Sequence, residues 1–353
     1  MIKKRLIKLK NILKKKGLDA LFITNPVNVY YMSGFRTDAS SLVISKDVNI
    51  IITDFRYRED AEKIPDFTAL TIEDNFKKTL NRALKELGVK KIGFEAGHLS
   101  YSGVQNLKAI LSKEKILVEP LEGTVEEIRV LKDEAEIAEI KKAVGLAKTV
   151  LCSLKSHLRP GMTERALAKM LEGLILSHGG DGNAFDTIIA SGKNSSRAHA
   201  YITDKRIEKD EHVFIDFGVK LNQYNCDLTR VFFLGKIQKL LHTAYDICME
   251  AQERAIKKVR PGAPIKEIDR AARGYIASKG FGKFFGHSLG HGVGLSVHEL
   301  PRIFSKSNQT LKPNMVFTIE PGIYLEGIGG MRIEDMVLVT EKGCEILTDD
   351  IPK

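Results

Sequence analysis

EHVFIDFGVKLNQYNCDLTRVFF, residues 211–233, contains two short runs rich in Val, Phe, Ile and Thr. The runs at 212–218 and 226–233 have the residue types of β-strands, and the segment 220–223 between them is suited to a tight turn. The stretch therefore predicts a β-hairpin.

Two carboxylates, Asp216 and Asp227, lie on opposite strands of this expected hairpin. If Leu221 and Asn222 are the two loop residues, Asp216 pairs directly with Asp227. Directly opposed residues hold their Cβ atoms roughly 4.5 to 5.5 Å apart, where like charges repel each other. A bound cation would compensate this repulsion, so the hairpin indicates a metal site.

Three more candidate ligands follow along the chain. His291 lies in the glycine-rich segment GHSLGHGVG, and Glu320 directly follows an expected strand at 316–319. Arg332 and Glu334 are two residues apart, so in a strand an arginine and a carboxylate project from the same side.

These residues and their neighbours resemble the metallopeptidase family that includes methionine aminopeptidase, aminopeptidase P and proline dipeptidase. The resemblance spans roughly residues 125–350 and includes the segments DFG, DLTR, GHGVGLSVHE and IEPG. The family order Asp, Asp, His, Glu, Glu is filled by Asp216, Asp227, His291, Glu320 and Glu334. Relatives that lost these ligands became creatinases or binding proteins, so a non-catalytic binding protein is the distant alternative. This chain keeps all five residues, which favours an enzyme.

The resemblance implies a site for two divalent metal ions. Asp216 would chelate one metal, Asp227 and Glu334 would bridge both, and His291 and Glu320 would complete the other. Four carboxylates balance two divalent cations, and an oxygen-rich donor set suits Mn²⁺ or Co²⁺, with Zn²⁺ or Fe²⁺ as alternatives. Such ions make hydroxide available at neutral pH and polarise a carbonyl, so amide hydrolysis is the expected reaction.

The resemblance also implies roles for residues around the metals. Glu320 would carry a proton from the nucleophile to the leaving amine. His199, His287 and His298 would line the pocket, where they bind substrate and stabilise the tetrahedral intermediate. Arg332 would hold the ligand carboxylates in place.

The expected fold is an α/β N-terminal domain at 1–122, followed at 123–353 by an α+β catalytic domain of the pita-bread fold. In the first domain, helical patterns at 2–16, 75–88 and 101–113 alternate with apolar runs at 20–23, 41–45, 48–52 and 91–94. A break at 120–124 precedes a long helix that Asp133 can cap.

An internal repeat divides the second domain. The segment LRPGM at 158–162 precedes an expected helix from Thr163, and VRPGA at 259–263 precedes another from Pro264. Two such units predict two similar halves. The resemblance implies an internal pseudo-twofold symmetry, with the metals between the halves.

The N-terminal domain makes the chain similar to aminopeptidase P and proline dipeptidase rather than to methionine aminopeptidase. In those enzymes this domain helps to form a homodimer and narrows access to the pocket. The implied substrate is a short peptide with Pro in the second position. An Xaa-Pro bond is a tertiary amide without an N–H, so it requires a dedicated pocket.

Arg302 bears on the preferred length of the substrate. It lies four residues beyond His298, as in some prolidases, where an arginine can meet the C-terminal carboxylate of a dipeptide. This interpretation slightly favours an Xaa-Pro dipeptidase over an aminopeptidase P that acts on longer peptides. The alternative is a surface arginine paired with Glu299 or a neighbouring strand.

Composition limits the remaining possibilities. The net charge of +10 and the lysine-rich first helix suggest nucleic acid as a partner. No aromatic residues are interleaved with those lysines, so a solvated helix face is the favoured interpretation. No apolar stretch approaches the twenty residues of a transmembrane helix. The four scattered cysteines are typical of the reducing cytoplasm.

Overall fold

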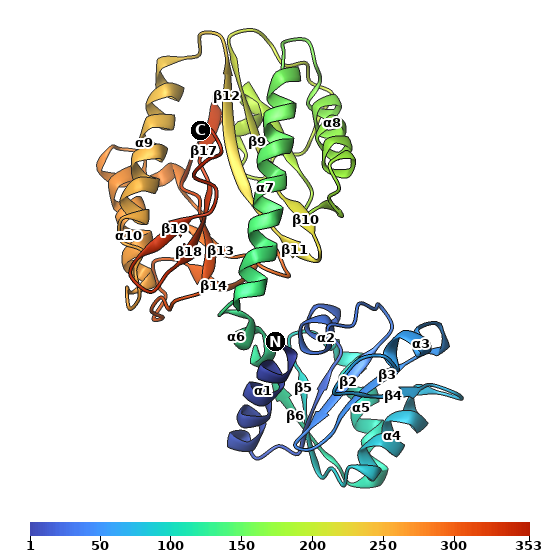
Figure 1. The fold of residues 1–353 in the computed structure, drawn as a ribbon. Helices are drawn as coiled ribbons and strands as arrows, with labels where there is room; N and C mark the ends of the chain where they lie inside the picture. The colour runs from blue at the N-terminus through green and yellow to red at the C-terminus, as the bar shows by residue number, and fades with distance from the viewer. The chain divides into compact units, whose positions relative to one another are not determined.

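The computed structural model describes residues 1–353, and the chain divides into two units, Met1–Arg129 and Val130–Lys353. The first unit contains a six-stranded mixed sheet in the order β4-β3-β2-β1-β5-β6 (Figure 1). Its strands are β1 (Ala20–Ile23), β2 (Ser41–Ser45), β3 (Asn49–Thr53), β4 (Thr68–Thr71), β5 (Lys91–Glu95) and β6 (Leu117–Leu121). Its helices are α1 (Ile2–Lys16), α2 (Pro26–Ser33), α3 (Arg58–Ala61), α4 (Phe76–Glu86), α5 (Tyr101–Leu111) and α6 (Thr124–Arg129). The predicted α/β alternation is confirmed.

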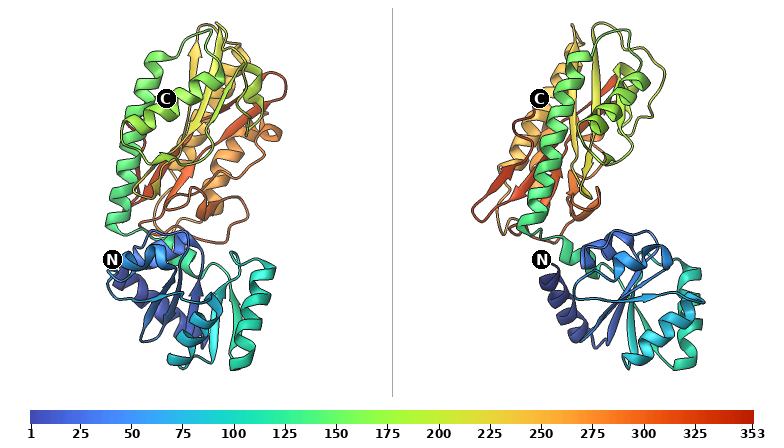
Figure 2. Two further views of the ribbon diagram at one scale, coloured as in Figure 1. Left: turned by 90° about the vertical axis from the view of Figure 1, so that its right-hand side faces the viewer. Right: turned by 45° about the vertical axis from the view of Figure 1, so that its right-hand side comes forward.

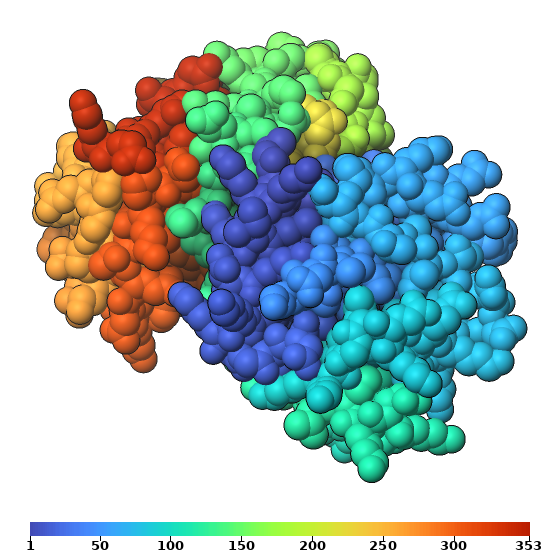
Figure 3. Space-filling model, turned by 60° about the horizontal axis from the view of Figure 1, so that its bottom comes forward, coloured from blue at the N-terminus to red at the C-terminus, as the bar shows by residue number.

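Helices α4 and α5 pack on one face of this sheet, where Leu80 and Leu107 join Phe22 and Ile92 in the core. Helix α1 lies at the surface of the first unit (Figure 3). It buries Leu6, Leu9 and Leu13 and exposes most of its lysines, as expected for an amphipathic helix. No helix in the structure has the length and apolar character needed to span a membrane.

The second unit is built from two similar halves, in which helices cover strands that meet in the middle (Figure 2). In the first half, α7 (Glu134–His157) and α8 (Glu164–Ser177) accompany the sheet β12-β9-β8, with β8 (Ile188–Ser191), β9 (Glu211–Phe217) and β12 (Leu228–Leu234). In the second half, α9 (Lys239–Ile256) and α10 (Ile265–Ser278) accompany the sheet β14-β13-β15-β18-β19. Those strands are β13 (Gly290–Gly292), β14 (Glu299–Ile303), β15 (Val316–Ile319), β18 (Asp335–Val339) and β19 (Cys344–Ile346). Smaller ladders are β7 (Gly182–Asn183), β10 (Val219–Leu221) and β11 (Tyr224–Asn225), and the pair β16 (Gly322–Leu325) and β17 (Gly329–Arg332).

The two halves repeat the same backbone contacts around the two Arg-Pro-Gly segments. Gly161 donates its N–H to the Ile207 carbonyl at 2.8 Å, and Gly262 donates to the Leu311 carbonyl at 2.8 Å. Both glycines have positive φ, 92° and 78°, which a side chain would disfavour. The predicted pair of similar halves is confirmed.

Helix α7 begins where its cap predicts. The Asp133 side chain accepts from the Glu136 N–H at 3.1 Å, and the Glu136 side chain accepts from the Asp133 N–H at 3.0 Å. This reciprocal capping box satisfies two backbone donors at the helix start.

The register of the central hairpin differs from the prediction. Asp216 pairs with Thr229, not with Asp227, because the two loop residues are Asn222 and Gln223 rather than Leu221 and Asn222. Both loop residues have positive φ, 50° and 72°, as a type I′ turn requires. A leucine resists that conformation, so Leu221 stays in the strand. The shift of two residues keeps Asp216 and Asp227 on the same face as diagonal neighbours.

Candidate metal centre

The five candidate ligands come from the strands where the two halves meet. Asp216 lies in β9, Asp227 directly precedes β12, and His291 lies in β13. Glu320 directly follows β15, and Glu334 lies between β17 and β18.

Four of these residues converge on a small volume. The His291 Nε2 atom lies 3.6 Å from Asp227 Oδ2 and 3.3 Å from Glu320 Oε1. Ligand atoms of Asp227, His291 and Glu334 all lie within 4.8 Å of one another. Arg332 links Asp216 to this group. It forms an ion pair with Asp216 and donates a hydrogen bond to Thr229, which itself hydrogen-bonds to Glu334.

His291 presents an electron pair to the carboxylates. Its Nδ1 atom lies 3.1 Å from the Val297 carbonyl oxygen and 3.2 Å from that of Gly292. Carbonyl oxygens only accept, so Nδ1 carries the proton and Nε2 is the free acceptor or metal ligand. Burial also lowers the pKa of His291, which favours the neutral ring.

Two threonines orient the carboxylates. Thr229 donates through Oγ1 to Glu334 Oε2 at 2.6 Å, and Thr318 donates through Oγ1 to Glu320 Oε1 at 3.1 Å. Sequence reasoning assigned neither residue to the site. A signal was present for both, because each lies two residues from a candidate ligand and period-two alternation places it on the same strand face.

Arg332 and Tyr324 connect the carboxylates to a pocket histidine. Arg332 donates through Nη1 to the Tyr324 hydroxyl at 2.7 Å, and that hydroxyl lies 3.1 Å from His287 Nε2. His287 Nδ1 donates to the Ser288 carbonyl at 2.8 Å, so Nε2 accepts from Tyr324. Burial lowers the pKa of His287 to about 4, which keeps it neutral. Tyr324 carries no signal in the sequence, since only tertiary contacts bring it here.

The segment around Glu334 is not the single strand that was expected. Strand β17 ends at Arg332 and pairs with β16, whereas β18 begins at Asp335 and pairs with β15. Glu334 lies in the link between two sheets. It still meets Arg332, because both side chains hydrogen-bond to Thr229.

The buried charges fit divalent cations. Burial, together with the neighbouring carboxylates, raises the pKa of Asp227 and of Glu334 well above the usual range. Burial likewise raises the pKa of Glu320 to about 7. Asp216 Oδ1 is buried without a hydrogen-bond partner. A set of four carboxylates opposed by one arginine and oriented by hydroxyl groups is suited to metal binding.

We expect the stability of the metal-free protein to fall as pH rises. The pKa values of Asp227 and Glu334 are raised in the metal-free fold, so the stability linked to them is present below about pH 4. It is lost as pH rises through the raised folded pKa values. Buried His212 and His287 have pKa values lowered to about 4, so they oppose this trend only below their ordinary value of 6.5. Thermal melts of chelated protein above about pH 6.5 should show a falling Tm, and added divalent cation should restore it most strongly at the upper end. A flat Tm in the chelated protein would contradict this.

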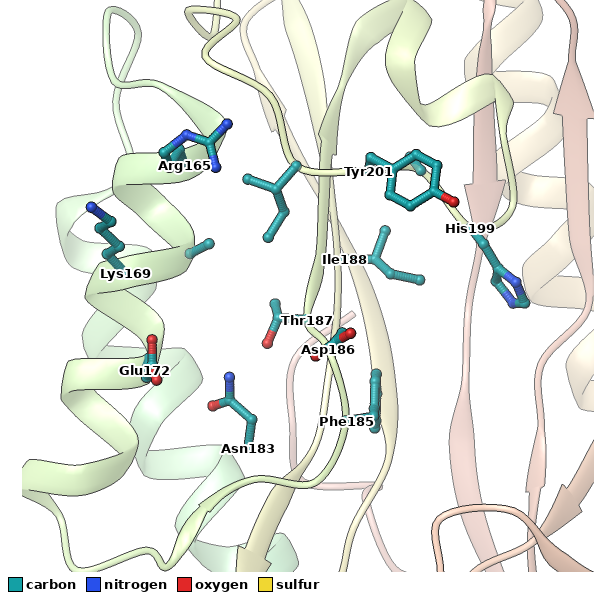
Figure 4. A pocket seen from close by; sticks show the side chains of 13 residues that line it. Arg165, Lys169, Glu172, Asn183, Phe185, Asp186, Thr187, Ile188, His199 and Tyr201 are labelled. Atoms are coloured by element: carbon teal, nitrogen blue, oxygen red, sulfur yellow. The ribbon is translucent and has the colours of Figure 1, made fainter.

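A cavity of about 760 Å³ lies around the edge strand β8 and is lined by α8, Asn183, residues 185–188 and residues 199–202 (Figure 4). Ile188 pairs with Asp216, so the two share one sheet face, and Figure 4 shows Ile188 and His199 on the side of the strand away from α8. His199 is exposed. Burial raises the pKa of Asp216, and the positive charge of Arg332 opposes this rise. The cavity therefore includes one of the three predicted pocket histidines, His199.

The remaining pocket residues lie on the second half. The His298 ring is exposed, and its centroid lies 4.1 Å from that of His291. Arg302 is exposed in β14 and pairs in register with His291. It is not paired with Glu299, whose carboxylate instead lies 2.6 Å from Lys132 Nζ. Arg302 Nε lies 3.4 Å from Ser288 Oγ.

Comparison with known proteins defines the class. Residues 138–341 match the metallopeptidase family M24, and residues 5–131 match the creatinase/prolidase N-terminal domain. The chain therefore belongs to metallopeptidase family M24, and the prediction of a metal-dependent peptidase of the pita-bread fold behind an α/β domain is confirmed.

Individual relatives are similar over their whole length. A Pyrococcus furiosus protein named Xaa-Pro dipeptidase is 37% identical over 351 residues, covering 98% of each chain. The structure of an Xaa-Pro dipeptidase from Bacillus anthracis has a TM-score of 0.97 at 35% identity and covers 100% of this chain and 99% of that one. The structure of an X-Pro aminopeptidase from Thermotoga maritima has a TM-score of 0.88 at 38% identity and covers 94% and 96%.

Proposed function

We propose that this protein is a dinuclear-metal peptidase that hydrolyses the Xaa-Pro bond at the N-terminus of short peptides, with Xaa-Pro dipeptides as preferred substrates. The observation that carries this proposal is the buried group of carboxylates facing His291 Nε2, with donor atoms within 4.8 Å of one another. Relatives named for cleavage of Xaa-Pro substrates support the choice of peptide.

Two divalent cations would be held by the five candidate ligands. Asp216 would serve one ion, Asp227 and Glu334 would bridge both, and His291 and Glu320 would complete the second. The donor set of four carboxylates and one imidazole favours Mn²⁺ or Co²⁺, and Zn²⁺ or Fe²⁺ are alternatives. When bound, the ions would polarise the scissile carbonyl and make hydroxide available at neutral pH.

The protein side chains would move protons and hold the substrate. Glu320 would accept a proton from the nucleophile and pass it to the leaving amine, the role that a carboxylate beside the nucleophile can fill. His199 and His298 are exposed beside the cluster, which supports their role in substrate binding. His287 would line the pocket, and it would donate to the tetrahedral intermediate only with a proton on Nε2, in place of the hydrogen bond that Nε2 accepts from Tyr324. Arg332 would keep Asp216 oriented through their buried ion pair.

The first unit would support dimer formation and restrict substrate access, and the protein would act in the cytoplasm. Large exposed apolar side chains on this unit, Phe55 at 80% and Tyr101 at 81% exposure, support an association surface. Four free cysteines support a reducing compartment. Light scattering of the purified protein tests the dimer.

Arg302 is the basis for the dipeptide preference. It lies opposite His291 in the ladder, so both side chains leave the same face of the sheet. Its guanidinium is exposed and has no carboxylate partner. A guanidinium binds a carboxylate bidentately, and such bonds to charged groups contribute about 1.5 to 3 kcal/mol.

We expect Arg302→Ala to lower kcat/KM for an Xaa-Pro dipeptide about tenfold to a hundredfold, because the bond to the C-terminal carboxylate is lost. The same substitution should leave the dipeptide amide unaffected. The measurement compares Xaa-Pro, its amide and an Xaa-Pro-Yaa tripeptide in wild type, Arg302→Ala and Arg302→Lys. The lysine variant keeps the positive charge but cannot bind a carboxylate bidentately, so its kcat/KM for the dipeptide should be intermediate.

A different outcome would identify an aminopeptidase P. If the tripeptide is cut as well as the dipeptide and Arg302→Ala changes neither, Arg302 is structural and the enzyme acts on longer peptides. Loss of all activity in chelated wild type, with recovery on adding Mn²⁺, tests the metallopeptidase chemistry separately.

A further inference from the structure

Each of the three pocket histidines lies on a segment that a buried acidic side chain outside the metal centre holds, either directly or through an arginine. We infer that Glu164, Asp269 and Glu299 are positioning residues for His199, His287 and His298, respectively. This inference rests on the proposed function, in which these histidines hold the substrate.

Glu164 joins both ends of the segment 191–203, which carries His199. Its side chain is fully buried in the first turn of α8. Oε1 accepts from the Ser191 N–H at 2.7 Å, and Oε2 accepts from the Thr203 hydroxyl at 2.5 Å and its N–H at 3.2 Å. The Asn194 amide donates to both oxygens at 3.1 Å. All these partners donate, so only a carboxylate, which accepts at both oxygens, matches them.

Asp269 acts on His287 through an arginine. Asp269 is fully buried in α10, and its two oxygens accept from Arg273 at 2.8 Å each. The other guanidinium hydrogens reach the carbonyl oxygens of Phe285 at 3.0 Å and of His287 itself at 2.8 Å. The Asp269 carboxylate therefore orients the Arg273 guanidinium, which holds the His287 backbone.

Glu299 holds the turn that carries His298. Its carboxylate, 6% exposed, pairs with Lys132, 1% exposed, at 2.6 Å. It also accepts from the Ser296 N–H at 3.3 Å. The carbonyl of Val297 in this turn accepts from His291 Nδ1, so the same turn orients a candidate ligand.

The repetition of this arrangement favours positioning over stability as its purpose. The second helix of each half, α8 and α10, supplies an acid that fixes a histidine-bearing segment. Buried charges are costly to desolvate and are often replaceable by apolar residues without loss of stability. A binding pocket, in contrast, loses activity when its groups are misplaced by about 1 Å.

The test combines each isosteric amide, Glu164→Gln, Asp269→Asn and Glu299→Gln, with each histidine-to-alanine substitution. We expect each amide to lower kcat/KM about tenfold to a hundredfold. In a matched pair, such as Glu164→Gln with His199→Ala, the double variant should equal the alanine variant. In mismatched pairs, such as Glu164→Gln with His287→Ala, the two fold-losses in kcat/KM should multiply, so these pairs serve as internal controls.

A second measurement does not depend on activity. Histidine Cε1–Hε1 resonances of the zinc-loaded protein, which is diamagnetic, should shift in each amide variant mainly for its own histidine. Thr203→Val removes one bond to Glu164 and should move the His199 resonance in a milder way, which covers the case that Glu164→Gln does not fold.

The outcomes test the positioning roles of the three acids separately from the substrate-binding roles of the histidines. The positioning roles are overturned if the histidine resonances shift equally in all variants. They are also overturned if the fold-losses in kcat/KM multiply in matched pairs as they do in mismatched pairs. If the histidine-to-alanine variants retain full kcat/KM while the resonances shift as expected, the anchoring stands and the proposed substrate-binding roles of the histidines fail.

Discussion

The Asp227→Asn variant should hydrolyse Xaa-Pro substrates slower by on the order of a thousandfold or more, since even partners outside the ligand set contribute about tenfold to a hundredfold to metal affinity. Asp227 Oδ2 lies 3.6 Å from His291 Nε2, and its ligand atoms group with those of His291 and Glu334. An amide in its place removes one negative charge between two cations. Both metals should therefore bind more weakly, and metal analysis after dialysis should show the loss.

The fold should survive this substitution. Asp227 is repelled by its neighbouring carboxylates, which help to raise its pKa in the metal-free protein, so an uncharged amide is tolerated there. Its circular dichroism should match wild type. Asp74→Asn makes the same chemical change at an exposed residue of the first unit and should keep full activity. A fully active Asp227→Asn, or wild type that remains active after exhaustive chelation, would exclude a bridging role.

The Glu320→Gln variant should lose about two to four orders of magnitude in kcat, the range that general acid–base catalysis supplies. Glutamine keeps the shape of glutamate but cannot take up and release the proton. Glu320 Oε1 lies 3.3 Å from His291 Nε2 and accepts from Thr318. The amide oxygen can still accept from Thr318, so the side chain should keep its orientation.

Metal content decides how this result is interpreted. Loss of kcat with two metals still bound assigns the proton transfer to Glu320, whereas loss of metal reveals a ligand role alone. Glu326→Gln is the matched control, because Glu326 is exposed in the loop between β16 and β17. Near-normal turnover of metal-loaded Glu320→Gln would remove this residue from the mechanism.

Local features of the fold were predictable because their physical causes lie close together in the chain. The capping box at Asp133 needs only residues 133–136, and the strands at 20–23 and 41–45 are short apolar runs. The Arg-Pro-Gly repeat marks two helix starts that the structure places in equivalent positions. The hairpin prediction is correct in topology but wrong in register, because the tight turn needs two residues of positive φ, and Asn222 and Gln223 supply them while Leu221 stays in the strand.

Features of the site that depend on distant segments were not predictable in this way. Tyr324 reaches Arg332 and His287 only after the β16–β17 hairpin folds against η3 (Gly192–Ser196) and α9. Glu164 meets residues 27 to 39 positions further along the chain. Neither residue differs locally from an ordinary tyrosine in a strand or an ordinary acid in the first turn of a helix.

The sequence by itself determined the two units, the paired halves and the order of the five candidate ligands, because periodicity, capping and motif spacing are written in neighbouring residues. Only the tertiary structure decided the hairpin register, the hydroxyl groups that orient Glu334 and Glu320, and the buried acids behind the pocket histidines. These depend on which side chains become neighbours when the strands meet. Such contacts join residues that are far apart in the chain, so no local pattern encodes them.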